Sequence, residues 1–162
     1  MPVKAHQYLW VNPFRREHPQ AVVHKLWRDT ALLRGISPGD SRELVTHTHP
    51  RHYQPGEALF REGETGVAAA LVVSGQLSVQ SRGQTLVRLD IGDFVGETAL
   101  LEDTPRSATV VAETPVTVSL LVRYQLEEFV QFRPRVGARI MTNLARLLAA
   151  RLRMGNQAEP SS

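Results

Sequence analysis

The sequence predicts a mainly β protein: an antiparallel β-roll, similar to a double-stranded jelly-roll barrel, with helices at both ends. Two observations support this. Glycine recurs at short intervals between residues 56 and 96, and the segments between these glycines alternate or are rich in β-branched residues, as short strands joined by turns do. Before and after this region, apolar residues recur at helical spacing. The 162 residues suffice to bury one core without disulfides, and no cysteine is present.

The N-terminal part of the chain is expected to be helical after an irregular start. Residues 1–19 mix aromatic, basic and proline residues without periodicity and are interpreted as an arm. Helical spacing of apolar residues predicts a helix over 20–34. Ser37 as N-cap and Pro38 at the first position predict a second helix, which runs to about Thr46.

The middle and the end of the chain contain the other expected elements. A short helix is expected over 125–132, and a longer one begins at Pro134 and ends near Met154, where Gly155 follows. The strands expected between the glycine turns are 58–61, 69–73, 76–80, 85–89, 108–112 and 116–122.

These elements form one expected domain over residues 20–154. The roll takes about 51–122, and the C-terminal helices take about 124–154. Residues 1–19 precede the domain as the arm, and residues 155–162 are expected to be a disordered tail.

Composition excludes several classes of protein. The net charge of +3 arises from 19 basic and 16 acidic residues, without the dense basic stripe of a nucleic-acid binder. No apolar run approaches the ~20 residues of a membrane span, and the first residues lack a secretory signal, so we expect a cytoplasmic protein with no membrane partner. No nucleophile elbow or phosphate loop of the Gly-x4-Gly-Lys type is present, so we do not expect an enzyme.

The run from Phe94 to Thr109 has the residues of an anion site. Arg106 supplies a guanidinium whose planar fork suits two phosphate oxygens, and the hydroxyl of Ser107 follows it. Residues Thr98, Ala99 and Leu100 are expected to begin a single helical turn with free N–H groups, and the small Ala99 lets a phosphate approach the backbone.

Glu97 has a different expected role in the same run. A carboxylate repels phosphate, so its expected partner is a ribose 2′-hydroxyl, and Gly96 permits the backbone geometry that points it inward. An alternative is that Glu97 and Arg106 form an ion pair that only fixes the loop, since a buried arginine needs a partner.

The run resembles the phosphate-binding cassette of cyclic nucleotide-binding domains, whose pattern is roughly Phe-Gly-Glu-x-Ala-Leu followed by Pro-Arg-x-Ala-Thr. Here Val95 is inserted before Gly96, and the resemblance extends over about Leu26 to Arg153. It implies the sensor domain found in the catabolite activator protein, in cyclic-nucleotide-dependent kinase regulatory subunits and in cyclic-nucleotide-gated channels. Members often have an acidic residue that braces the cassette arginine in the strand corresponding to residues 66–73, where this chain has none.

The resemblance also implies a ligand and a moving part. The ligand is a cyclic nucleotide, and cAMP is expected ahead of cGMP. Kinases of the family that favour cGMP often carry threonine after the cassette arginine, where this chain has Ser107, whose hydroxyl could serve either base. A C-terminal helix closes over the purine in the family; residues 136–153 are the candidate here, with Arg151 and Leu152 expected to cap the ring.

How the domain would pass on its signal is inferred from the rest of the chain. The chain has no effector region and no helix-turn-helix after the last helix, so we expect no DNA binding. A stand-alone module of this kind would act in trans on a protein partner or form a homodimer through the C-terminal helix. A ligand-free roll that serves as a protein-interaction scaffold is the alternative.

A metal-dependent barrel enzyme is a third, weaker hypothesis. His47, His49 and His52, with Glu57 nearby, have ligand types that suit zinc or iron. Pro50 is expected to interrupt a strand there, which favours an exposed connector between helix and strand. We therefore expect no metal.

Overall fold

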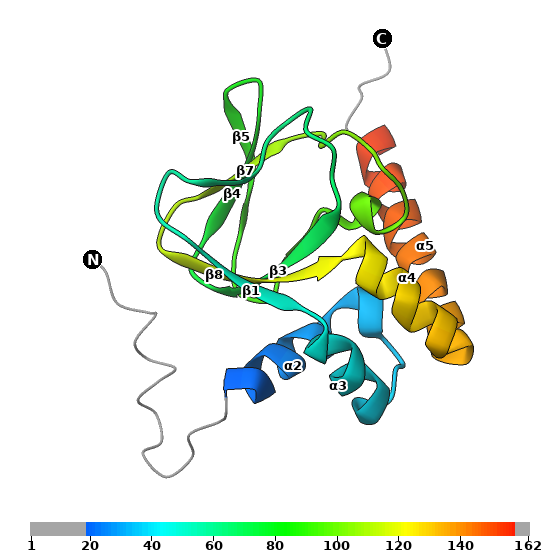
Figure 1. Cartoon of the computed structure of the whole chain (residues 1–162). Coiled ribbons are helices and arrows are strands. Elements are labelled where there is room, and N and C mark those ends of the chain that lie inside the picture. Colours follow the sequence, from blue (N-terminus) through cyan, green and yellow to red (C-terminus); the bar gives the residue numbers. More distant parts are fainter. Residues whose placement is uncertain (1–18, 158–162) are drawn as a thin grey trace.

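The computed structural model describes residues 19–157, so residues 1–18 of the predicted arm (1–19) and residues 158–162 of the predicted tail (155–162) lie outside the described residues. Pro19, the last residue of the predicted arm, begins the first described helix. A β-roll is flanked by N-terminal helices on one side and by the last two helices on another (Figure 1). In chain order the elements, of which η1 and η2 are short 3₁₀ helices, are α2 (Pro19–Asp29), η1 (Ala31–Leu33), α3 (Pro38–Thr46), β1 (His49–Tyr53), β2 (Ala58–Phe60), β3 (Ala68–Ser74), β4 (Leu77–Ser81), β5 (Gln84–Leu89), β6 (Phe94–Val95), η2 (Glu97–Leu100), β7 (Thr109–Ala112), β8 (Val116–Val122), α4 (Arg123–Phe132) and α5 (Pro134–Gln157).

The strands form two four-stranded sheets, with orders β1-β8-β3-β6 and β2-β7-β4-β5. All strand pairs are antiparallel. The predicted fold class, an antiparallel roll with helices at both ends, is confirmed. The strand predictions missed β1 and β6. The two residues of β6 are too few for a periodicity signal.

Strand β3 separates two apolar cores. Alternate residues of a strand point to opposite faces, so Ala70 and Val72 pack between the sheets while Ala69 and Leu71 pack against the helices. Both faces are covered, which explains why the strand is almost continuously apolar. The helical side centres on Trp27 of α2, which is fully buried and donates its indole N–H to Ser119 Oγ at 2.9 Å.

Two helix boundaries differ from the prediction. The segment 20–34 is not one helix: α2 ends at Asp29, and η1 follows after Thr30, whose hydroxyl donates to the Trp27 carbonyl. Helix α5 continues past Gly155 to Gln157, so the predicted stop at Gly155 is wrong. A glycine ends a helix by adopting a left-handed conformation, and Gly155 does not adopt one. The predicted N-cap is confirmed, since Ser37 Oγ accepts from the N–H of Asp40.

Strand β1 corrects the prediction that Pro50 interrupts a strand. His49 to Tyr53 pair with β8, and Pro50 lies opposite Ser119 in the register. The strand is at the edge of its sheet, so the missing N–H of proline can face away from the neighbouring strand without loss of a ladder bond. Between residues 19 and 157, the structure brings together no group of three or more His, Asp or Glu side chains placed to hold a metal ion.

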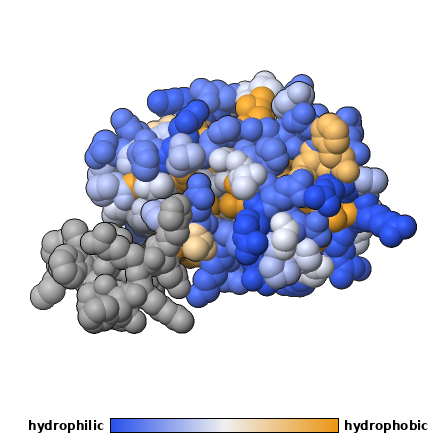
Figure 2. Space-filling model, turned by 60° about the horizontal axis from the view of Figure 1, so that its bottom comes forward, coloured by the Kyte–Doolittle hydropathy of each residue, from blue (hydrophilic) through white to orange (hydrophobic). Residues whose placement is uncertain are grey.

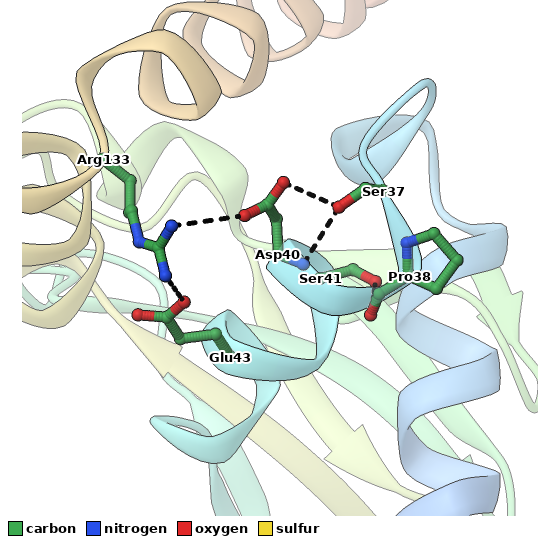
Figure 3. Close-up of polar contacts among 6 residues, drawn as sticks. All are labelled: Ser37, Pro38, Asp40, Ser41, Glu43 and Arg133. Carbon is green, nitrogen blue, oxygen red and sulfur yellow. Dashed lines mark hydrogen bonds and ion pairs between the residues drawn. The ribbon is translucent and has the colours of Figure 1, made fainter.

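The junction between α4 and α5 is tied to helix α3 by ion pairs (Figure 3). Arg133, the residue between the two helices, approaches Glu43 Oε2 at 2.5 Å and Asp40 Oδ1 at 3.8 Å. Asp40 also accepts a hydrogen bond from Ser37 Oγ, the N-cap of α3. Gly137 lets the two helices approach closely, because a Cβ there would lie 2.7 Å from a methyl carbon of Val130. The start of α5 is therefore held from two sides.

The surface shown in Figure 2 is largely hydrophilic, with apolar side chains in small separate groups. Over all described residues, the large apolar side chains that are exposed to at least half their area are Val67, Leu86, Tyr124, Phe132, Leu152 and Met154. In the described part of the chain, no helix combines the length and the apolar character that a membrane span requires.

Candidate functional site

The candidate site is built around the short connection from β6 to η2. Gly96 lies between them with φ 84° and ψ 24°, a left-handed conformation that favours glycine. A Cβ at this position would lie 2.7 Å from Arg106 Nη1 and 3.1 Å from the ring of Phe60. Gly96 is thus required for both its conformation and its space, and the 3₁₀ helix that follows presents Glu97 toward the interior.

The guanidinium of Arg106 is held by the protein on several sides. It donates to the carbonyl oxygens of Ala68 at 2.6 Å and Gly96 at 3.5 Å, and its Cζ lies 3.5 Å from the centroid of the Phe60 ring. It also packs on Gly66, where a Cβ would lie 2.8 Å from Cζ. A cation over an aromatic face is attracted by the ring quadrupole. The Ala68 carbonyl thus holds the guanidinium beside a strand that has no acidic residue.

The backbone around Arg106 is fixed as well. Its N–H donates to the Glu64 carbonyl at 2.8 Å, and its own carbonyl accepts from the N–H of Gly63 at 2.9 Å. Burial lowers the pKa of Arg106, and the charge of Glu64 opposes that effect. An arginine stays protonated through such a shift. The result is an immobilised, half-buried positive charge.

Glu97 is the most buried acidic group of the described residues, with 1% of its side chain exposed. Its Oε1 pairs with Nη1 of Arg151 on α5, and it makes no ion pair with Arg106, which contradicts the loop-fixing alternative. Its Oε2 is buried and has no hydrogen-bond partner within the described chain. Burial raises the pKa of this carboxyl, and the Arg151 charge and nearby backbone N–H groups of Glu97 and Gly96 counteract part of the effect.

The structure brings most of the predicted site residues to one place. Ala99 and Leu100 are buried beside β3, while the side chains of Thr98 and Ser107 are exposed. Arg151 contacts the site by its ion pair with Glu97, and its guanidinium also donates to the Phe94 carbonyl at 3.2 Å. Leu152 is 70% exposed.

Sequence reasoning missed Phe60, Gly66 and the Ala68 carbonyl. Phe60 lies in a predicted strand, but an aromatic residue that packs on a guanidinium has the same sequence signal as one in a core. Gly66 was interpreted only as a turn residue, although its φ is not left-handed and it serves by close approach. A backbone carbonyl has no sequence signal.

A hollow of about 340 Å³ lies next to this site, between η1 and α5. Arg151 is the one residue that belongs both to its lining and to the predicted site; Arg34, Asn143 and Arg146 supply its other polar groups. Two hydrogen bonds from the Asn143 amide, to the carbonyls of Leu32 and Arg34, fix α5 against η1.

The arrangement fits an anion with a neighbouring hydroxyl. A preformed cation, a short helix and a buried carboxylate with a free acceptor oxygen lie around one loop. The sequence profile of the cyclic nucleotide-binding domain matches residues 50–132. The chain belongs to this family. The recognition made from the cassette is therefore confirmed.

Known members show how the domain is used elsewhere. The cAMP-dependent protein kinase regulatory subunit of Yarrowia lipolytica is 35% identical over 96 residues, which are 58% of this chain and 26% of that protein. Glutaminase 1 of Bradyrhizobium diazoefficiens is 38% identical over 126 residues, 77% of this chain and 20% of that protein. The catabolite activator protein of Thermus thermophilus superposes with a TM-score of 0.70 at 31% identity, over 79% of this chain and 61% of the other.

This chain spans about a quarter or less of these two curated relatives. One of them bears an enzyme's name, although the family itself is a regulatory domain. What the chain is shown to have in common with the family is the cyclic nucleotide-binding domain.

Proposed function

We propose that this domain is a regulatory sensor that binds a cyclic nucleotide at residues 96–107, with cAMP preferred over cGMP. The observation that carries the proposal is the environment of the Arg106 guanidinium. Two backbone carbonyls accept its hydrogen bonds, the Phe60 ring packs against it, and two glycines leave the space that it occupies. A cation held in place before the ligand arrives loses little conformational freedom on binding.

The phosphate would lie between Arg106 and the start of η2. Guanidinium binds phosphate oxygens with two parallel hydrogen bonds, and the first N–H groups of a 3₁₀ helix have no partner inside the helix. The buried Ala99 adds no bulk to this part of the site, and Ser107 would add a hydroxyl.

The ribose would lie against Glu97. Its Oε2 is a buried acceptor that no described residue satisfies, and a ligand hydroxyl is the group that would satisfy it. A carboxylate in this position would favour a ribonucleotide over its 2′-deoxy analogue, because the analogue leaves the acceptor without a partner.

The preference for cAMP and the output of the sensor are supported less directly. Several similar kinase subunits are named for cAMP, and one similar kinase is named for cGMP. Helix α5 is the proposed moving part, because it contacts η2 and carries the arginine that pairs with Glu97. A partner protein or a second copy would then sense the position of α5.

Calorimetric titration tests the proposal. Wild-type protein is titrated with cAMP, cGMP and 5′-AMP, and the same titrations are run on Arg106→Ala. We expect cAMP to bind most tightly and the substitution to cost about 2–5 kcal/mol of binding free energy, since it removes a charged, desolvated contact.

Arg88→Ala is the matched control, because Arg88 is an exposed arginine of β5. It should bind as wild type does. If wild type binds neither cyclic nucleotide, or if Arg106→Ala binds cAMP as tightly as wild type while remaining folded, the proposed site is wrong. Tighter binding of cGMP would overturn only the base preference.

A further inference from the structure

The hollow between η1 and α5 gathers positive charge outside the proposed nucleotide site. Its volume of about 340 Å³ is that of a small-ligand site, and none of residues 96–107 lines it. Arg34, the C-cap residue of η1, lines one wall, and Arg146 and Arg151 of α5 line the other. Arg151 pairs with Glu97, so the charges that remain to be explained are those of Arg34 and Arg146.

The charges of Arg34 and Arg146 are not paired within the described chain. Between residues 19 and 157, neither guanidinium takes part in an ion pair or a hydrogen bond. Helix α5 carries no Asp or Glu over its whole length, and residues 30–39 carry none either. The hollow is therefore a region of positive potential, which attracts an anion from both walls.

The hollow keeps its shape because α5 is fixed against η1. Asn143 is 5% exposed, and its amide donates to the carbonyls of Leu32 and Arg34. Leu32 is itself fully buried in the core that the helices share. Arg34 and Arg146 are thus held on facing walls, although their charges repel each other. A bound anion would relieve this repulsion and would meet walls that need no rearrangement.

The lining indicates the class of ligand. Two unpaired guanidinium groups match the charge of a phosphate monoester, which is close to two at neutral pH, and their planar forks fit its oxygens. The apolar part of the lining consists of Ala31, Leu147 and Ala150. An inorganic ion would leave this apolar part in contact with water, whereas an apolar group attached to the phosphate would cover it.

We propose that the hollow is a second ligand site, which binds a small phosphate monoester with an apolar body through Arg34 and Arg146. The site is separate from the one proposed for the cyclic nucleotide, and this inference goes beyond the proposed function. The two arginines belong to η1 and α5, so the ligand joins the N-terminal part of the domain to the last helix. Its binding therefore favours the state in which these two elements are in contact.

Phenyl phosphate is the probe, because it combines a phosphate monoester with a small apolar ring. Wild type, Arg34→Met and Arg146→Met are titrated without nucleotide, at constant ionic strength, and followed by NMR of backbone amides and arginine Nε–H groups. Both substitutions are at exposed positions and keep an apolar stem, so the fold should be preserved. Inorganic phosphate and benzyl alcohol are titrated into wild type in the same way.

Two further variants separate the hollow from other sources of anion binding. Arg153→Met is the matched control, because Arg153 is an exposed arginine of the same helix that does not line the hollow. Arg106→Ala removes the cation of the proposed nucleotide site, where phenyl phosphate could also bind.

We expect saturable shifts at residues 31–34 and 143–151, with a dissociation constant of about 1 mM or lower. Arg34→Met and Arg146→Met should each weaken binding about fivefold or more, because one charge-assisted contact is lost. Inorganic phosphate should bind less tightly, since it makes no apolar contact, and benzyl alcohol should not produce these shifts, since it has no charge. Arg153→Met and Arg106→Ala should keep the wild-type affinity at the hollow.

Four results would overturn the inference. An equal loss in Arg153→Met would mean that only net charge attracts the anion. Shifts that are confined to the cassette and vanish in Arg106→Ala would mean that the probe binds only at the proposed nucleotide site. Tighter binding of inorganic phosphate would contradict the apolar part of the ligand, and no saturable shift at the hollow would mean that its arginines are only solvated. None of these results touches the proposed function, which is tested separately with cyclic nucleotides.

Discussion

At the scale of single residues, the candidate site depends on glycines that let the Arg106 side chain approach the backbone closely, as much as on its charged groups. Arg106 lies against Gly66 and Gly96, and neither position has room for a side chain while the guanidinium keeps its place. Gly66 is the more informative of the two, because its φ is not left-handed and alanine could adopt its backbone conformation.

Gly66→Ala should therefore displace the arginine at little cost to the fold. The new Cβ would lie 2.8 Å from the Arg106 guanidinium, which is the far end of a flexible side chain, and 3.0 Å from the Ala99 Cβ. We expect the free energy of unfolding to change by less than about 1 kcal/mol. Cyclic nucleotide affinity should fall about tenfold or more, because the displaced cation no longer faces the phosphate. Calorimetry and chemical denaturation measure the two effects.

Gly75→Ala is the opposite control for that experiment. Gly75 has φ 83°, and a Cβ there would lie 2.3 Å from the Pro115 carbonyl oxygen, which belongs to the backbone and cannot move aside. We expect a loss of stability of more than about 1 kcal/mol. Affinity in the remaining folded protein should be unchanged. If Gly66→Ala also loses stability but keeps its affinity for the cyclic nucleotide, Arg106 does not bind the phosphate.

The sequence predicted which residues form the candidate site, and that prediction stays a prediction, but it did not predict that Glu97 pairs with Arg151. Glu97 and Arg106 were found because a carboxylate and a guanidinium near a glycine-linked turn are unusual together. The partner of Glu97 was not found, because Arg151 lies on a helix whose packing decides which of its arginines reaches the loop. Arg139, Arg146 and Arg153 of that helix have the same sequence signal.

At the scale of elements, periodicity predicted long segments and failed at short or edge ones. The apolar stripe of α5 and the alternation of apolar residues in β8 were clear in the sequence. Strand β6 has only two residues and β1 contains a proline, so neither shows such a pattern. A proline is acceptable in β1 only because the strand is at an edge, and its place in the sheet is a property of the fold rather than of the five residues.

The junction of α4 and α5 leads to a prediction about how α5 is held. Arg133 pairs with Glu43 and Asp40 of α3, but the arginine side chain is 48% exposed, so the pairs should contribute less than about 1 kcal/mol and weaken with salt. Arg133→Met should therefore leave the melting temperature almost unchanged. It should nevertheless increase amide hydrogen exchange at the start of α5, because a restraint on that end of the helix is lost.

Arg135→Met is the control for that measurement, because Arg135 is an exposed arginine of the same turn without an ion pair to a described residue. It should leave the exchange of α5 as in wild type. Faster exchange in both variants would mean that net charge, and not the contact with α3, determines the stability of this end. No change in either would mean that packing on Val130 and Ile140 is sufficient.

At the scale of the whole molecule, the order of elements and the antiparallel roll could be predicted, but the division into two cores could not. The continuous apolar run of β3 is consistent with a strand that is covered on both faces, and the sequence does not show what covers each face. In the structure the helices at both chain ends meet on one face of β3, where Trp27, Leu126 and Ile140 share a core. The binding loop lies beside that core, since Leu100 of η2 belongs to it.

This shared core is why a ligand at the loop should be sensed by α5. Helix α5 contacts η2 through Arg151 and through the core that contains Leu100, Ile140 and Leu144. A ligand that binds more tightly when these contacts are formed shifts the population toward the docked helix by its difference in affinity for the two states. We expect saturating cAMP to slow amide hydrogen exchange over residues 136–153 and to leave β4 and β5, in the other sheet, nearly unchanged. Protection at 136–153 that is the same with and without cAMP, at concentrations where calorimetry shows binding, would make α5 a fixed element and place the output of the sensor elsewhere.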